Sequence, residues 1–138
     1  MTQEERFPPW MRVSTRDMDS TAGRYMLAGG SQSDWADYGR WFALRQILST
    51  TPGACLDAGN PRILGSLARQ LGFGGQRRCR EWLQSLSECG AIDRGSWDER
   101  GEVVDAEIYN SVASYQSRCR TNALNKAGRK GDESATSR

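Results

Sequence analysis

Arginine side chains gather in one short stretch of the chain. Residues 61–80 carry five basic residues and no carboxylate, a net charge of +5. These residues are Arg62, Arg69, Arg77, Arg78 and Arg80. A guanidinium group presents paired N–H donors that match phosphate oxygens. The chemistry offered here is therefore phosphate recognition, and the alternative is a basic face that meets only solvent.

Charge changes sign along the chain, although the 138 residues have a net charge of only +2. Residues 81–119 carry −5 and residues 120–138 carry +3. Between Asp93 and Glu107, six carboxylates outnumber two arginines. Phosphate would be repelled there unless Arg94 and Arg100 alone face it. The acidic segment therefore keeps a protein partner open as an alternative.

Residues suited to catalysis or metal binding are sparse. The sequence has no histidine, the commonest general base, and no nucleophile–base motif. Its four cysteines include no C-x-x-C pair, which argues against zinc. Cys79 falls on an apolar helical position and is expected in the core. We expect no enzyme activity, catalytic residue, metal or cofactor.

No stretch approaches the roughly 20 apolar residues that a membrane span needs. The charged start of the chain is unlike a secretory signal, so we expect a cytoplasmic protein with no membrane partner. Three regions are predicted: an extended arm over residues 1–14, a folded domain over residues 15–119, and a basic, disordered tail over residues 120–138.

The first part of the domain reads as two helices and a strand. A short helix is expected over residues 21–28, ended by Gly29 and Gly30. A longer helix should begin at a cap on Ser33 or Asp34 and run to about Ser49. Its apolar stripe includes Trp35, Tyr38, Trp41, Phe42, Arg45 and Leu48. Residues 54–57 form a strand candidate.

Two further helices follow, separated by glycines. Asn60 can cap the first, and Pro61 suits its first turn. Residues 72–75 break the pattern, and the second helix spans about residues 76–88. Its inward positions are Cys79, Trp82, Leu83 and Leu86. Ala68 is small enough to let the second helix cross the first closely.

The remaining part predicts a β-hairpin and a last helix. Residues 91–94 and 102–109 resemble strands, and a polar loop with glycines at both ends joins them. Trp97 at the tip is expected to fold back on the hairpin, and insertion or stacking is the alternative. Asn110 can cap the last helix, and Cys119 is placed to pack within it.

Together these elements predict a mainly α fold with a small β-hairpin, a winged helix with a helix-turn-helix near residues 61–90. The major groove accepts one α-helix, whose exposed face reads base edges while flanking cations hold phosphates. The candidate DNA contacts are Arg69, Gln76, Arg77, Arg78, Arg80 and Gln84, with Arg94 and Arg100 in the wing. Double-stranded DNA is the expected partner.

Several segments resemble the N-terminal winged-helix domain of phage and mobile-element replisome organisers, related to DnaD-type primosome proteins. The similar segments are residues 10–14, 17–19, 39–48, 67–72, 82–92, 108–112 and 125–131. The resemblance implies a post-wing strand and helix start at residues 108–112. It implies DNA binding or self-association, in replication initiation or gene control, and gives no catalytic residue. Such proteins often have a further C-terminal replication domain; we expect none here, so helicase loading is not implied.

A second hypothesis uses the same fold differently. The chain would be a winged-helix interaction module that dimerises or binds a replication protein. The aromatic residues of the first segments and the acidic wing would form the contacts. A monomer with salt-sensitive DNA binding favours the first hypothesis, and a tight oligomer indifferent to DNA favours the second.

Overall fold

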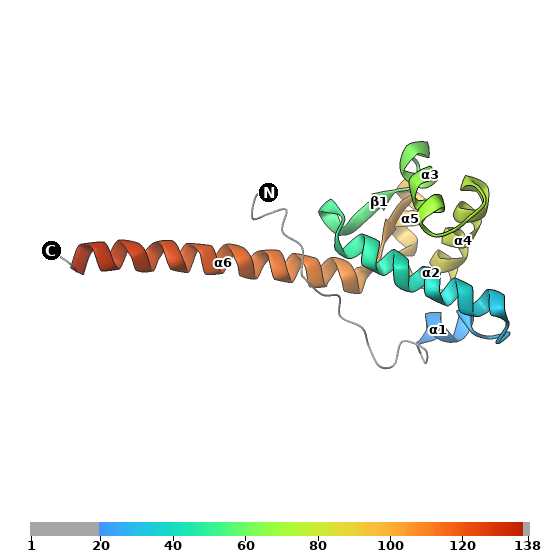
Figure 1. Ribbon diagram of the computed structural model, residues 1–138, viewed down its shortest axis with the longest axis horizontal. Helices are drawn as coiled ribbons and strands as arrows, with labels where there is room; N and C mark the ends of the chain where they lie inside the picture. The colour runs from blue at the N-terminus through green and yellow to red at the C-terminus, as the bar shows by residue number, and fades with distance from the viewer. Residues whose placement is uncertain (1–19, 137–138) are drawn as a thin grey trace.

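The structure is a computed structural model that describes residues 20–136, with side chains through residue 128. The elements in chain order are α1 (Thr21–Met26), α2 (Gln32–Ser49), the 3-10 helix η3 (Pro52–Ala54), β1 (Cys55–Asp57), α3 (Pro61–Gln70), α4 (Gln76–Glu88), α5 (Arg94–Arg100), β2 (Glu102–Val104) and α6 (Ala106–Thr136) (Figure 1). The fold is therefore mainly helical with a small two-stranded antiparallel sheet, as predicted. The expected arm over residues 1–14 lies outside the described residues.

The two strands come from distant parts of the chain. β1 and β2 are antiparallel, and the paired residues are Cys55 with Val104, Leu56 with Val103, and Asp57 with Glu102. The predicted pairing of residues 91–94 with 102–109 is wrong, because the intervening loop folds as α5 and β1 pairs with β2 instead. Asp93 adds one backbone hydrogen bond, from its N–H to the carbonyl of Val104 (2.7 Å).

Helix α5 forms because residues at both of its ends satisfy backbone groups. The Asp93 carboxylate accepts hydrogen bonds from the Ser96 hydroxyl (2.6 Å) and the Ser96 N–H (2.9 Å). These bonds lower the pKa of Asp93 because they favour its charged form. Gly101 ends the helix in the left-handed region, at φ 63°. The glycine that suggested a hairpin is therefore a helix C-cap.

Helix α2 begins earlier than predicted. Ser31, rather than Ser33 or Asp34, is its N-cap. The Ser31 hydroxyl accepts from the Asp34 N–H (3.2 Å), and the Asp34 carboxylate accepts from the Ser31 N–H (3.4 Å). This reciprocal capping box makes Asp34 the partner of the cap. Trp35 is 50% exposed and so lies outside the core to which the apolar stripe assigned it.

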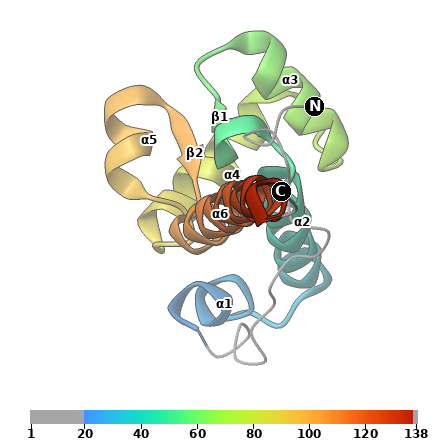
Figure 2. The same cartoon turned by 90° about the vertical axis from the view of Figure 1, so that its left-hand side faces the viewer.

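The core lies where α2, α3, α4, β2 and the start of α6 meet. The largest fully buried side chains are Leu44, Leu48, Leu64, Leu83, Leu86, Val103 and Ile108. Burying one such leucine contributes about 1.5–3 kcal/mol. Cys79 is also buried, as predicted. Figure 2 looks along α6 and shows α3 and α5 on opposite sides of the two strands.

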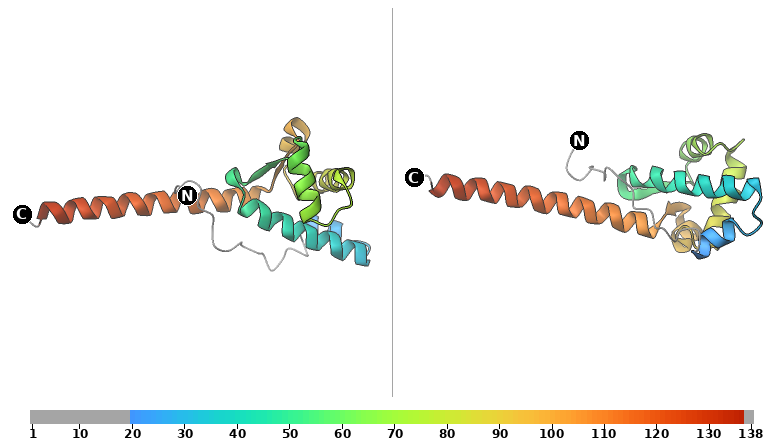
Figure 3. Two further views of the ribbon diagram at one scale, coloured as in Figure 1. Left: turned by 45° about the horizontal axis from the view of Figure 1, so that its top comes forward. Right: turned by 60° about the horizontal axis from the view of Figure 1, so that its bottom comes forward.

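Helix α6 differs from the prediction at both ends. It starts at Ala106, and the Asp105 carboxylate accepts a hydrogen bond from the Ile108 N–H (3.1 Å), so Asn110 lies inside the helix and does not cap it. The strand that the resemblance implied at residues 108–112 is likewise helical. The helix continues through Thr136 and extends away from the other elements (Figure 3). The structure therefore has a helix where a disordered tail is predicted after Arg120. Helix hydrogen bonds are local, and no proline interrupts them.

Candidate nucleic-acid interface

The arginine-rich stretch forms the helical pair α3–α4, with the bounds that local signals predict. The Asn60 side chain accepts from the Arg62 N–H (3.0 Å), and Pro61 opens α3. Gly72 adopts φ 78°, which suits glycine, and reverses the chain after α3. These contacts fix where α3 begins and ends before α4 starts at Gln76.

Small residues of α3 let the start of α4 approach closely. Ala68 is buried, as its predicted role requires. A Cβ atom added at Gly65 would lie 3.1 Å from the side-chain nitrogen (Nε2) of Gln76. That nitrogen donates a hydrogen bond to the carbonyl of Pro61 (3.2 Å). Gln76, predicted as a DNA contact, therefore also links the first turns of the two helices.

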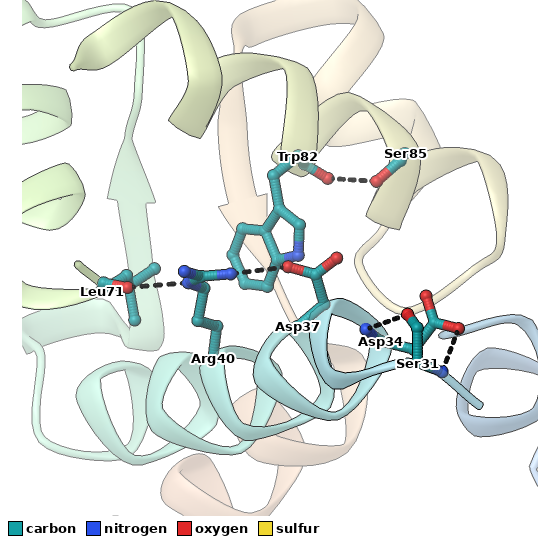
Figure 4. Close-up of polar contacts among 7 residues, drawn as sticks. All are labelled: Ser31, Asp34, Asp37, Arg40, Leu71, Trp82 and Ser85. Carbon is teal, nitrogen blue, oxygen red and sulfur yellow. Dashed lines mark hydrogen bonds and ion pairs between the residues drawn. The ribbon is translucent and has the colours of Figure 1, made fainter. Parts of the chain in front are cut away.

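Arg40 of α2 supports the connection between α3 and α4. Its Nε donates to the carbonyl of Leu71 (2.9 Å), and its Nη1 forms an ion pair with Asp37 (2.8 Å) (Figure 4). Its guanidinium carbon lies 4.7 Å from the centre of the Phe73 ring. Phe73 in turn packs against Trp82 of α4, with ring centres 5.5 Å apart. Arg40 thus joins α2, the connection and α4.

We expect Arg40→Met to lower the free energy of unfolding by about 1–2 kcal/mol, because a charge-assisted hydrogen bond and a cation–π contact are lost. Urea unfolding measures this change. Arg40→Lys keeps the charge but cannot reproduce the planar donor geometry, so it should recover only part of the loss. An unchanged urea midpoint for Arg40→Met would contradict the supporting role.

The predicted arginines of α3 and α4 are all on the surface. Arg62, Arg69, Arg77, Arg78 and Arg80 are exposed. Arg77 forms an ion pair with Glu81 one turn later (3.2 Å), and its side chain remains 92% exposed. Among the described residues, the other four arginines form no ion pair. An exposed ion pair contributes little, so all five cations are available to a ligand.

An open groove of about 640 Å³ lies between the starts of α3 and α4. Arg62, Arg69 and Gln76 line it together with Gly74 and Gly75. Within the described part of the chain, no side chain caps α4 at Gly75. The first turn of α4 thus keeps backbone donors and a partial positive charge beside two arginines. This electrostatic arrangement suits a phosphate group.

Gln84 lies further along α4 and already has two partners. Its side-chain oxygen accepts from the Trp97 Nε1 (2.6 Å), and its nitrogen donates to the Glu88 carboxylate (3.2 Å). Trp97 therefore joins α5 to α4, rather than folding onto a hairpin as predicted. Base readout by Gln84 would require breaking these contacts.

Arg94 and Arg100 occupy an acidic part of the surface. Arg94 pairs with Asp98 (3.5 Å) and Arg100 pairs with Glu102 (3.4 Å). All four side chains belong to the predicted wing segment, which carries a net charge of −4. Local carboxylates therefore partly neutralise these two arginines, unlike Arg78 and Arg80.

A buried ion pair that the sequence did not reveal joins α2 to the start of α6. Arg45 and Asp105 are 2% and 6% exposed. Their Nε and Oδ2 atoms lie 3.1 Å apart, and Glu107 contacts the Arg45 Nη2 at 3.1 Å. The one available signal was an arginine within the apolar stripe of α2. No pattern in the sequence indicates that Asp105 is its partner.

Neither a reactive Cys79 thiol nor a metal-ligand group is found in the described residues. Burial raises the pKa of the Cys79 thiol to about 11, so it is protonated at neutral pH and a poor nucleophile. In residues 20–128, no three metal-ligating side chains form a group. The helices in the described range include none with the length and apolar character to cross a membrane.

What distinguishes this surface is the exposed arginine cluster on α3 and α4, held in place by Arg40, Phe73 and Trp82. The acidic α5–β2 region lies next to it along the chain. Comparison with protein-family models, curated proteins and solved structures finds no match to this chain.

Proposed function

We propose that this chain is a DNA-binding protein with a winged-helix fold, in which α4 lies in the major groove of double-stranded DNA. The observation that carries the proposal is the uncovered arginine cluster of α3 and α4. An exposed helix fits the groove, and cations on its flanks can neutralise phosphates on both sides. The resemblance to replisome organisers supports replication initiation or transcriptional control as the process.

The winged-helix assignment draws support from the order of elements. β1, α3, α4, α5 and β2 follow one another in the chain, and β1 pairs with β2. α5 stands where a wing loop would be expected. Its carboxylates disfavour phosphate, so we assign DNA contact mainly to α3 and α4.

Individual residues receive different roles in this proposal. Arg78 and Arg80 are the main phosphate contacts, because each is exposed and lacks a carboxylate partner in the described structure. Arg69 and Gln76 line the groove at the start of α4. Arg77 faces the DNA from the first turn of α4. Gln84, Arg94 and Arg100, predicted as DNA contacts, are assigned only a small contribution, because each has a protein partner.

We expect Arg78→Gln/Arg80→Gln to weaken binding to random-sequence duplex DNA by about tenfold or more at low salt, because two charge-assisted contacts are lost. The slope of log affinity against log salt should become shallower by about two units. Fluorescence anisotropy of a labelled duplex at several salt concentrations measures both quantities.

Arg94→Gln/Arg100→Gln is the matched control, since it removes the same charge from the acidic region. Its affinity should stay within about threefold of wild type, because the six carboxylates of residues 93–107 repel phosphate from that segment. Equal losses in both variants would show that only net charge matters. Unchanged binding by Arg78→Gln/Arg80→Gln would refute the assignment of α4.

A protein-interaction module is the second candidate function. Tyr25, Trp35 and Tyr109 are 55%, 50% and 49% exposed, and large exposed aromatic side chains are common in protein interfaces. Light scattering distinguishes the two functions. A monomer that binds DNA in a salt-sensitive manner supports the first, whereas a stable oligomer that ignores DNA supports the second.

A further inference from the structure

The outer part of α6, residues 117–136, carries only positive charges over most of its length. Between Glu107 and Asp132 the sequence has no carboxylate. The basic residues in that interval are Arg118, Arg120, Lys126, Arg129 and Lys130. Arg118, Arg120 and Lys126 are exposed. Among the described residues these three form no ion pair, so their charge is not neutralised.

Among the described residues, outer α6 has no packing partner of its own. The first turns of α6 pack against α2 and η3, and Ile108 and Val112 are buried there. Beyond them the helix runs away from the other elements, on the side opposite the α3–α4 pair (Figures 1 and 3). Leu124 is 74% exposed. The basic surface of outer α6 is therefore separate from that of α4.

A solitary helix of this composition gains stability from a polyanion. Helices without tertiary packing are marginal in water, and the like charges of this segment repel one another. Within residues 108–131 no carboxylate offsets this repulsion. Phosphates on both sides of the helix remove the repulsion, so binding and helix formation reinforce each other.

Composition separates the possible occupants of this helix. An interfacial membrane helix needs a continuous apolar face, and a coiled coil needs apolar residues at every third or fourth position. After Cys119, Leu124 is the one large apolar residue of the sequence in outer α6. Carboxylates on a protein partner would form exposed ion pairs, each of which contributes little binding free energy. Each contact with a DNA phosphate also releases a counterion, which favours binding.

We propose that outer α6 is a second DNA-binding surface, which contacts the phosphate backbone of a duplex through Arg118, Arg120 and Lys126. The inference rests on the proposed function in taking DNA as the ligand, but it uses different residues. Because outer α6 extends away from α3 and α4, one chain can hold two duplexes at once (Figure 1). The protein should therefore bridge separate DNA molecules.

The test compares the wild-type full chain with Arg118→Gln/Arg120→Gln/Lys126→Gln. Glutamine is a good helix former, so the substitution mainly removes charge. The variant should lose about tenfold or more in duplex affinity, with a salt slope shallower by about two to three units. Duplex DNA should increase helical circular dichroism at 222 nm in wild type and less in the variant. Ser117→Gln/Thr121→Gln/Asn125→Gln is the matched uncharged control and should behave as wild type.

A bridging assay separates this inference from the proposed function. Wild type should retain a labelled duplex in solution on an immobilised one, and both the α6 variant and Arg78→Gln/Arg80→Gln should lose this retention. If the α6 variant binds and bridges like wild type while the α4 variant is impaired, the inference is overturned and the proposed function stands. If only the α6 variant loses affinity, the α4 assignment fails and outer α6 keeps its role.

Two other results would also overturn the inference. The α6 substitutions could change the mass of the protein measured by light scattering without DNA, which would make a second copy of the chain the occupant. Wild type could bind phosphatidylserine vesicles but not duplex DNA, which would make an anionic membrane the occupant.

Discussion

Asp105→Ala should lower the free energy of unfolding by about 3–5 kcal/mol, because it removes the buried carboxylate that contacts the Arg45 Nε and so breaks a buried ion pair. The Nε of Arg45 lies 3.1 Å from the Asp105 carboxylate, and both residues are almost fully buried. The same carboxylate caps α6 through the Ile108 N–H. The substitution therefore removes both a buried charge pair and a helix cap, and urea unfolding measures the total.

Three control variants separate these effects. Asp105→Asn keeps an oxygen for the cap and should lose less than Asp105→Ala. Glu107→Gln tests the other carboxylate near Arg45, whose side chain is 52% exposed, and should cost about 1 kcal/mol or less. Arg45→Met/Asp105→Asn removes both charges of the buried pair and should be more stable than Arg45→Met alone. Equal stability of Asp105→Ala and Glu107→Gln would contradict the importance of the buried pair.

Trp82→Ala should have a comparably large effect, about 3–5 kcal/mol, because it empties a large volume between α4 and the α3–α4 connection. Trp82 is 8% exposed and packs against Phe73, which also carries the Arg40 guanidinium. Small domains have a total stability of about 5–15 kcal/mol, so the loss is a large fraction of it. Urea unfolding gives the change, and a mixture of folded and unfolded protein would also bind DNA more weakly.

Trp35→Ala is the matched control, since the same side chain type is removed from a half-exposed position. Trp35 contacts Tyr38 edge to face, with ring centres 6.1 Å apart, so a loss of about 1 kcal/mol or less is expected. Trp82→Phe should keep part of the contact with Phe73. Similar losses in Trp82→Ala and Trp35→Ala would mean that Trp82 does not support α4 in the way that we describe.

The elements that bear the candidate site were predictable because their signals are local. Asn60 and Pro61 start α3, the glycines of residues 72–75 end it, and α4 follows at Gln76. The inward positions of α4 repeat at helical spacing, which also leaves Arg77, Arg78 and Arg80 exposed. Capping and periodicity act over a few residues, so the sequence alone was sufficient for them.

Local signals were also present where the prediction failed. Asp93 and Ser96 form a start signal for α5, and Gly101 is its stop signal. The glycines of this segment predict a hairpin loop because they lie between two strand-like runs. Glycine at positive φ is common both in helix C-caps and in hairpin turns. Only the pairing of the strands distinguishes the two.

The tertiary structure alone decided the pairings between distant residues. β1 pairs with β2 across three intervening helices, and Arg45 meets Asp105 although 60 positions separate them. It also decided that Arg94, Arg100 and Gln84 have protein partners, whereas Arg78 and Arg80 do not among the described residues. Spacing in the sequence records which residues share a face of one element. It does not record which faces meet, because that depends on how all the elements bury their apolar surfaces together.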